Sequence, residues 1–382
     1  MAAIPTSHRR AVLARRQTMG AVLGLGAFAL MALAMGAAGV SLTLYVFAQW
    51  GVGRHGVGLV LFVVAVALWW FAWRAGGCLM APLPRPDGEC LDRARAPTLY
   101  TLVDRMGERF GGMTIDALYI TGEMNVALFQ RPSRGLWGRM ETYLLIGLPL
   151  AHSVSTRQLE AIIAHEFGHL YCQRRGRAAW GGHVRAWWLR TVERSLDALP
   201  GVGMLLDRLT LGQLLRAQQL CRKEEFEADQ AAAKVLGALG VAGALVEVVV
   251  KERFLHGDYW AKVMAQSHFS PRPLIRPYRE MGCGMLAGFP KWRGRGDFLR
   301  SMFAEEEGGE LHPTLYERLG ALGEKLEAVL AQVPDVSAAQ SCLAAELDEL
   351  AWALDRDWWW RIRDDWRAAY RDASRSPGSQ LA

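Results

Sequence analysis

The stretch AIIAHEFGHLYC, residues 161–172, decides how the rest of the chain is interpreted. Its apolar residues recur at helical spacing, which predicts a helix with one buried face. Ser155 and Gln158 stand three residues apart just before it, in the pattern of a capping box at a helix start. We therefore expect a helix over residues 156–173.

The spacing of His165, Glu166 and His169 is typical of a metal site that activates water. Residues four apart on a helix share a face, so both imidazoles can bind one ion. A carboxylate beside the first histidine can then take a proton from water, and this HExxH spacing indicates zinc. The alternative is two histidines on a solvated helix face. The apolar neighbours predict instead a half-buried face, where unpaired histidines are costly, and Gly168 leaves room near the metal.

A catalytic zinc needs a third protein ligand, with the fourth position left for water. The helical stretch CRKEEFEADQAAAK, residues 221–234, offers candidates. Glu225 and Asp229 share a face there, so we predict Glu225 as the third ligand and Asp229 as the acceptor that fixes a histidine tautomer. Cys221 lies on the same face and is an alternative ligand. Without the HEFGH partner, an ordinary acidic helix surface would be the better interpretation.

Two apolar runs precede these motifs. Residues 19–48 contain no charged residue and exceed the roughly 20 residues that cross a bilayer, and residues 57–73 lie near the lower limit. A cleaved signal peptide is the alternative. However, the first run extends beyond an apolar core of about 7–15 residues, and a second run follows. We expect a retained transmembrane hairpin.

The arginines predict its orientation. Four precede the first run, one lies between the runs and four follow the second. They are Arg9, Arg10, Arg15 and Arg16, then Arg54, then Arg74, Arg85, Arg93 and Arg95. By the positive-inside rule, the N-terminus and everything after about residue 75 face the cytoplasm. The expected location is the inner membrane, with the lipid bilayer as a partner.

Composition excludes other classes. The net charge of +6 comes from 44 Lys and Arg against 38 Asp and Glu, but the basic residues are scattered, so nucleic-acid binding is not expected. Six widely spaced cysteines without a CxxC pair are typical of reduced thiols.

The expected fold class is mostly α with a small β-sheet (α+β). Three strand-like runs, at 114–121, 123–130 and 141–148, predict an antiparallel sheet after a helix that begins at Thr98. The charged stretch 178–199 is expected to be a helix that packs or lies at an interface. The predicted divisions are a basic N-terminus (1–18), two transmembrane helices (19–75), a linker (76–97), a zinc metallopeptidase domain (98–335), a Trp-rich C-terminal helix (336–373) and a tail (374–382).

HEFGH followed by Glu225-Phe-Glu-Ala-Asp229 resembles the HtpX heat-shock protease and CaaX prenyl endopeptidase family of membrane-associated zinc metallopeptidases. The resemblance implies a zincin-type gluzincin domain with one Zn²⁺ per chain. It implies His165, His169 and Glu225 as ligands and Glu166 as general base.

Two further segments are similar to that family. His312-Pro313-Thr314 with Arg318 resembles a motif near the active site, and Asn125-Val126-Ala127 resembles a strand that binds substrate backbone. The resemblance implies a catalytic role for His312 and a substrate-binding role for Asn125. The region 178–217 is too charged for the further membrane spans of HtpX, so processing of prenylated peptides is not expected.

These features predict a membrane-anchored, zinc-dependent endopeptidase. Its substrates would be polypeptides, including misfolded membrane proteins, and its role protein quality control. The alternative is a non-proteolytic, zinc-containing binding or assembly factor, which would have no need of Glu166.

Overall fold

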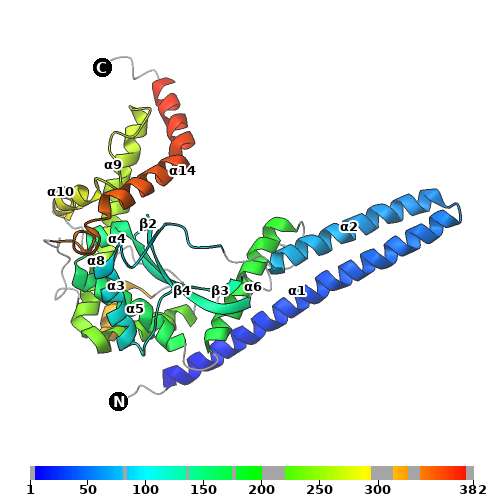
Figure 1. The fold of residues 1–382 in the computed structure, drawn as a ribbon, viewed down its shortest axis with the longest axis horizontal. Helices are drawn as coiled ribbons and strands as arrows, with labels where there is room; N and C mark the ends of the chain where they lie inside the picture. The colour runs from blue at the N-terminus through cyan, green and yellow to red at the C-terminus, as the bar shows by residue number, and fades with distance from the viewer. Residues whose placement is uncertain are drawn as a thin grey trace. The chain divides into compact units, whose positions relative to one another are not determined.

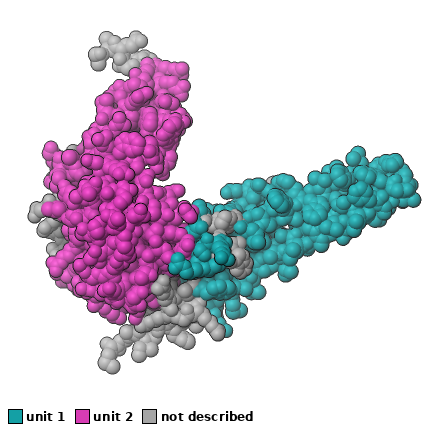
Figure 2. Space-filling view, in the orientation of Figure 1, with its two compact units in different colours: residues 1–84, 131–140, 173–223 teal, residues 85–130, 141–172, 224–382 magenta. Residues whose placement is uncertain are grey.

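The protein is described by a computed structural model over residues 5–80, 84–134, 137–173, 178–199, 220–293, 313–325 and 336–375. The chain divides into two compact units that interleave along the sequence (Figure 2). Unit 1 holds residues 1–84, 131–140 and 173–223, and unit 2 holds residues 85–130, 141–172 and 224–382.

Unit 1 is built on a helical hairpin. Helices α1 (Pro5–Gly51) and α2 (His55–Met80) run side by side (Figure 1). Gly53 turns the chain between them with a φ of 78°, a conformation that glycine adopts without strain. Among the described residues, these two helices are long and apolar enough to cross a membrane. Their side chains are mostly exposed, as at Leu33 (70%) and Val60 (64%).

Helix α6 (Ala178–Ala198) is the helix expected at 178–199, and it packs on the hairpin within unit 1. Trp188 is buried against Gly24, where a Cβ would lie 2.7 Å from the indole ring. The Trp187 indole N–H also donates to the Leu79 carbonyl at 2.9 Å. Helix α6 therefore uses its tryptophans to pack against apolar helices.

The sheet has four strands in the order β1 (Glu89–Leu91), β2 (Ala117–Thr121), β4 (Trp137–Gly147) and β3 (Val126–Arg134). The pair β1–β2 is antiparallel, but β2–β4 is parallel, so the expectation of an antiparallel sheet is wrong for that pair. The cause is the strand order. β3 lies at the edge of the sheet, and β4 lies between β3 and β2. Periodicity reports which residues form strands and carries no information on their order.

The other elements of unit 2 are helical, which makes the fold mostly α with a small mixed sheet (Figure 1). They are α3 (Pro97–Arg109), α4 (Leu148–Ser153), α5 (Thr156–Gln173), a helix at 220–236, α8 (Ala238–Phe254), the π-helical turn η1 (Leu255–Tyr259), α9 (Trp260–Ala265), η2 (Gln266–His268), α10 (Met281–Arg293), α12 (Leu315–Leu322), α13 (Ala338–Leu343) and α14 (Leu347–Arg375).

Helix α5 has the predicted bounds and is capped as expected. The Ser155 backbone N–H donates to Gln158 Oε1 at 2.8 Å, and the Gln158 N–H donates to Ser155 Oγ at 3.3 Å. Its inner face carries the fully buried Ile163 and Phe167, which share one core with the central strands of the sheet. That packing fixes the rotation of α5 and thereby the face on which its polar residues lie.

The C-terminal stretch, expected as one helix, is divided into α13 and α14. Trp366 on α14 is fully buried, and its indole N–H donates to the Ser270 carbonyl at 3.0 Å. Trp352, on the same helix, is half-exposed.

Candidate metal centre

Helix α5 and the helix at 220–236 approach each other at Gly168. A Cβ on Gly168 would lie 2.9 Å from the Ala228 carbonyl oxygen, closer than a side chain tolerates. The absence of a side chain at Gly168 thus makes room for the neighbouring helix. From the sequence, we had expected it to make room for a metal. This close approach brings Glu225 and Asp229 beside the histidines of α5.

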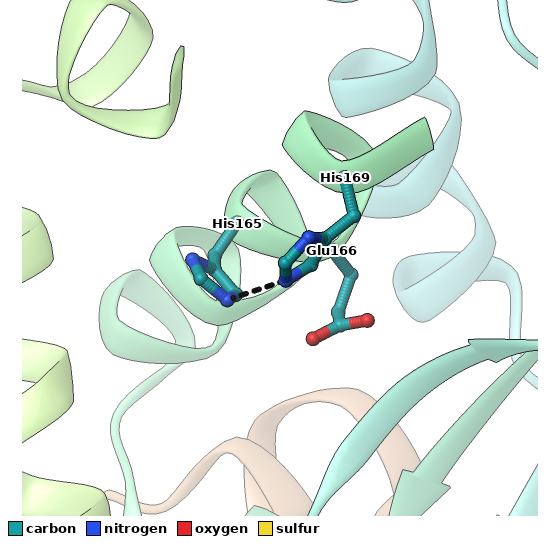
Figure 3. A group of neighbouring side chains, drawn as sticks. All are labelled: His165, Glu166 and His169. Carbon is teal, nitrogen blue, oxygen red and sulfur yellow. Dashed lines mark hydrogen bonds between the residues drawn. The ribbon is translucent and has the colours of Figure 1, made fainter. Parts of the chain in front are cut away.

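Two imidazole nitrogens and the two oxygens of one carboxylate converge beside α5. The Nε2 atoms of His165 and His169 are 3.1 Å apart, and Figure 3 shows the two rings turned toward each other. The Glu225 carboxylate lies 3.4 Å from the first Nε2 and 3.6 Å from the second. Ligands at zinc distances of 2.0–2.1 Å in a tetrahedron are separated by roughly 3.3 Å. The three side chains therefore fit a tetrahedral ion with one position left open.

Asp229 and Arg318 support this group from behind. Asp229 is almost fully buried, and its Oδ1 lies 2.8 Å from His165 Nδ1. Arg318, on α12, donates to both oxygens of Asp229 at 2.8 and 2.6 Å and lies 3.5 Å from Glu225. A bidentate arginine holds a carboxylate in one plane, so Asp229 keeps a fixed orientation toward His165.

Glu166 lies on the same helix and contacts the edge of the sheet. Its Oε2 accepts a hydrogen bond from the Leu128 backbone N–H in β3 at 3.2 Å. Its carboxylate also comes within 4.8 Å of the ring nitrogens of His165 and His169 (Figure 3). Burial raises the pKa of Glu166 above its ordinary value. A carboxylate so placed has the reach and the basicity of a proton acceptor.

Residues 135–326, just over half of the chain, match peptidase family M48. The chain belongs to this family. No curated protein and no solved structure gives a significant match. Membership confirms the resemblance drawn from HEFGH and Glu225-Phe-Glu-Ala-Asp229, and it makes the protein a metallopeptidase. The matched residues include every side chain of the group described above.

The electrostatics of this M48 peptidase fit a site for a cation. Burial alone lowers the pKa of His165, but hydrogen bonds with Asp229 and Glu225 raise it to about 9. Burial and the neighbouring His165 lower the pKa of His169 to about 4. Glu225, despite burial, has its pKa lowered to about 2 by His165 and Arg318. Without a metal, a proton on His165 thus supplies the positive charge between the carboxylates.

Three predicted site residues remain: Asn125, His312 and Cys221. Asn125 directly precedes β3, and its side chain donates to Glu123 at 3.0 Å. His312 lies outside the described residues, so its catalytic role stays a prediction. Cys221 is half-buried on the same helix as Glu225, one turn earlier.

Arg318 is the residue to which sequence reasoning gave no role in this M48 peptidase. In the sequence, Arg318 stands out only as part of the segment that follows His312-Pro313-Thr314. The local signal was nevertheless present: Thr314 and Glu317 form a capping box that starts α12. That start puts Arg318 in the first turns of the helix, from which it reaches Asp229.

Proposed function

We propose that this chain is a zinc-dependent endopeptidase of zincin type, with one Zn²⁺ held by His165, His169 and Glu225. The observation that carries the proposal is the convergence of two imidazole nitrogens and a carboxylate at tetrahedral separations, with Glu166 beside them. Zinc is favoured because two nitrogens and one oxygen with an open position form its usual catalytic ligand set.

The side chains divide the chemistry between them. Zinc in this site would polarise the scissile carbonyl and lower the pKa of water. Glu166 orients the attacking water and takes its proton, and the same carboxyl then donates a proton to the leaving amine. Asp229 holds His165 in the tautomer that presents Nε2, and Arg318 keeps Asp229 charged and oriented.

The substrate is a polypeptide that pairs with the free edge of β3. Leu128 directs its N–H to Glu166, away from the sheet, whereas the Asn125 carbonyl accepts from Gly147 of β4 at 2.8 Å. Alternate residues of a strand direct their backbone groups to opposite sides. Val126 and Leu128 therefore direct backbone groups to the side that a substrate would reach, and the Asn125 carbonyl points to β4. Recognition through backbone groups favours broad sequence specificity.

The hairpin α1–α2 anchors the enzyme in the inner membrane. Many of its apolar side chains are exposed on the surface of the protein, as expected for contact with lipid. Arginines in the first turns of α1, and at and beyond the end of α2, favour a cytoplasmic catalytic domain. An anchored, broadly specific peptidase is suited to quality control of misfolded membrane proteins.

The test compares the detergent-purified wild type with Glu166→Gln, and uses Glu160→Gln on the same helix as a matched control. We expect about one zinc per chain in all three, because none removes a ligand. The wild type and Glu160→Gln should cleave a casein-like substrate, lose activity to a chelator and regain it with zinc. Glu166→Gln should be inactive.

Full activity of Glu166→Gln would refute the general base. Zinc without cleavage in the wild type would instead favour a non-proteolytic binding or assembly factor.

A further inference from the structure

The segment between η2 and α10, residues 269–280, is pinned at several points. The Asp355 carboxylate on α14 accepts from the Tyr278 backbone N–H at 2.9 Å. The Tyr259 hydroxyl donates to the Pro277 carbonyl at 2.5 Å. The ring of Trp260 packs on that of Tyr278, with centroids 5.6 Å apart. A segment held by side chains from α14, η1 and α9 is a fixed strap, because opening it would break buried hydrogen bonds.

Tyr278 extends from this strap to the loop before β3. Its ring is buried, and its hydroxyl donates to the Gly122 carbonyl at 3.0 Å. A Cβ on Gly122 would lie 2.4 Å from that hydroxyl oxygen, so the contact requires glycine. Burial raises the pKa of Tyr278 to about 12, which keeps the hydroxyl protonated as a donor at neutral pH.

The loop at residues 122–125 is held on its other side by the end of β4. The Gly147 N–H donates to the Asn125 carbonyl at 2.8 Å, and a Cβ on Gly147 would lie 1.6 Å from the Glu123 carbonyl oxygen. The loop is thus fixed between Gly147 and Tyr278. It leads directly into Val126 and Leu128 on the edge strand of the described sheet, where the Leu128 N–H donates to Glu166.

We propose that Tyr278 is a positioning residue that fixes the start of β3. It thereby sets the affinity for those substrate residues that pair with Val126. The inference rests on the proposed function, because it assumes that a substrate pairs with this edge. Val126 lies two residues, about 7 Å, from Leu128. Only a peptide that extends about two residues or more from the scissile bond reaches it. The effect of Tyr278 therefore depends on peptide length.

The experiment uses Tyr278→Phe in the full-length protein, which removes the hydroxyl and keeps the ring. Tyr100→Phe is the matched control, since Tyr100 is equally buried and its hydroxyl donates to the Leu91 carbonyl at 2.7 Å. Both variants are assayed on peptides shortened stepwise from each end. We expect Tyr278→Phe to lose roughly 3- to 10-fold in kcat/KM on long peptides, through KM, and almost nothing on the shortest cleaved peptide. Tyr100→Phe should lose little on any of them.

Hydrogen exchange tests the same contact without catalysis. Amides of residues 122–126 should exchange faster in Tyr278→Phe, while those of α5 and the zinc content stay unchanged. Unchanged exchange at 122–126, or an equal loss of kcat/KM on all peptides, would overturn the positioning role. A wild type that holds zinc but cleaves no peptide would refute the proposed function, and the exchange data would still decide whether Tyr278 fixes the loop.

Discussion

Among the described residues of unit 2, two groups of buried charged side chains are organised in different ways. The metal cluster consists of His165, His169 and Glu225, with Asp229 and Arg318 behind them. The lysine cluster consists of Glu247 and Lys251 on α8 and His152 on α4. Both lie largely out of contact with solvent, so burial alone does not distinguish a metal site from a structural ion pair.

In the lysine cluster, the protein supplies its own cation. Lys251 is fully buried, lies 2.5 Å from Glu247 Oε2, and donates to the Ser153 carbonyl. The cavity beside it has room for about one water molecule. Burial lowers the pKa of His152 to about 4, so this histidine is neutral at pH 7. The Lys251 ammonium group contacts both the Glu247 carboxylate and the Ser153 carbonyl, so these oxygens already bind a cation.

The metal cluster has the opposite arrangement. Its fixed cation, Arg318, lies behind Asp229, and the Nε2 atoms of His165 and His169 and the Glu225 carboxylate face one another. We infer that convergence of ligand atoms, with the protein's own cation held to one side, is what suits this cluster to a metal ion. This conclusion predicts different responses of the two clusters to substitution.

The largest effect is expected from Glu225→Ala. Removal of the third ligand should reduce bound metal from about one ion per chain to nearly none, and hydrolysis should be lost with it. Glu227→Ala, two residues along the same helix, is the control and should keep both. Metal content is measured on dialysed protein by atomic emission. Retention of a full metal ion by Glu225→Ala would move the third ligand elsewhere, and Cys221 would be examined next.

Lys251→Met should affect stability and leave the metal in place. The substitution removes the ammonium group from beside the buried Glu247 carboxylate, so the free energy of unfolding should fall by about 3–5 kcal/mol. The double variant Lys251→Met/Glu247→Leu should recover most of this loss, because it removes both charges. Denaturant unfolding measures the free energy, and metal content should be equal in all three proteins. A loss of metal in either variant would mean that the two clusters are coupled.

Local spacing predicted the features that depend on one helix. The four-residue repeat of His165 and His169 and the capping box at Ser155 required only neighbouring residues. The contacts that complete the site join distant parts of the chain. Arg318 binds Asp229 across 89 residues, and Tyr278 binds Gly122 across 156 residues. A single sequence carries no pattern that pairs such residues, because their proximity follows from how helices and strands pack.

The strand order was unpredictable for the same reason. Runs of alternating residues located β2, β3 and β4 to within a few residues, but parallel pairing of β2 with β4 depends on which strand takes the edge. The two apolar helices are the opposite case, since length and apolar composition predict α1 and α2 without reference to any packing partner.

The smallest expected effect is a pH dependence of metal binding. The metal-free His165 has a pKa of about 9, and it must lose its proton to become a ligand. Metal affinity should therefore rise about tenfold per pH unit between pH 7 and 9, with one proton released per ion. Stability of the metal-free protein should change in the opposite direction. The pKa of His165 is raised, so its ion pairs contribute fully below its ordinary value of 6.5 and are lost as pH rises through about 9.

The Asp229 carboxylate both raises the pKa of His165 and orients its ring. Asp229→Asn tests these two effects separately. Without the charge that raises it, the pKa of His165 should fall, and the rise in affinity above pH 7 should become shallower. At pH 9 the affinity should be about 10- to 100-fold lower than in the wild type, because the histidine is less well oriented. Competition with a chelator from pH 6 to about 9.5 measures both quantities. An unaltered slope in Asp229→Asn would show that the proton released on binding does not come from His165.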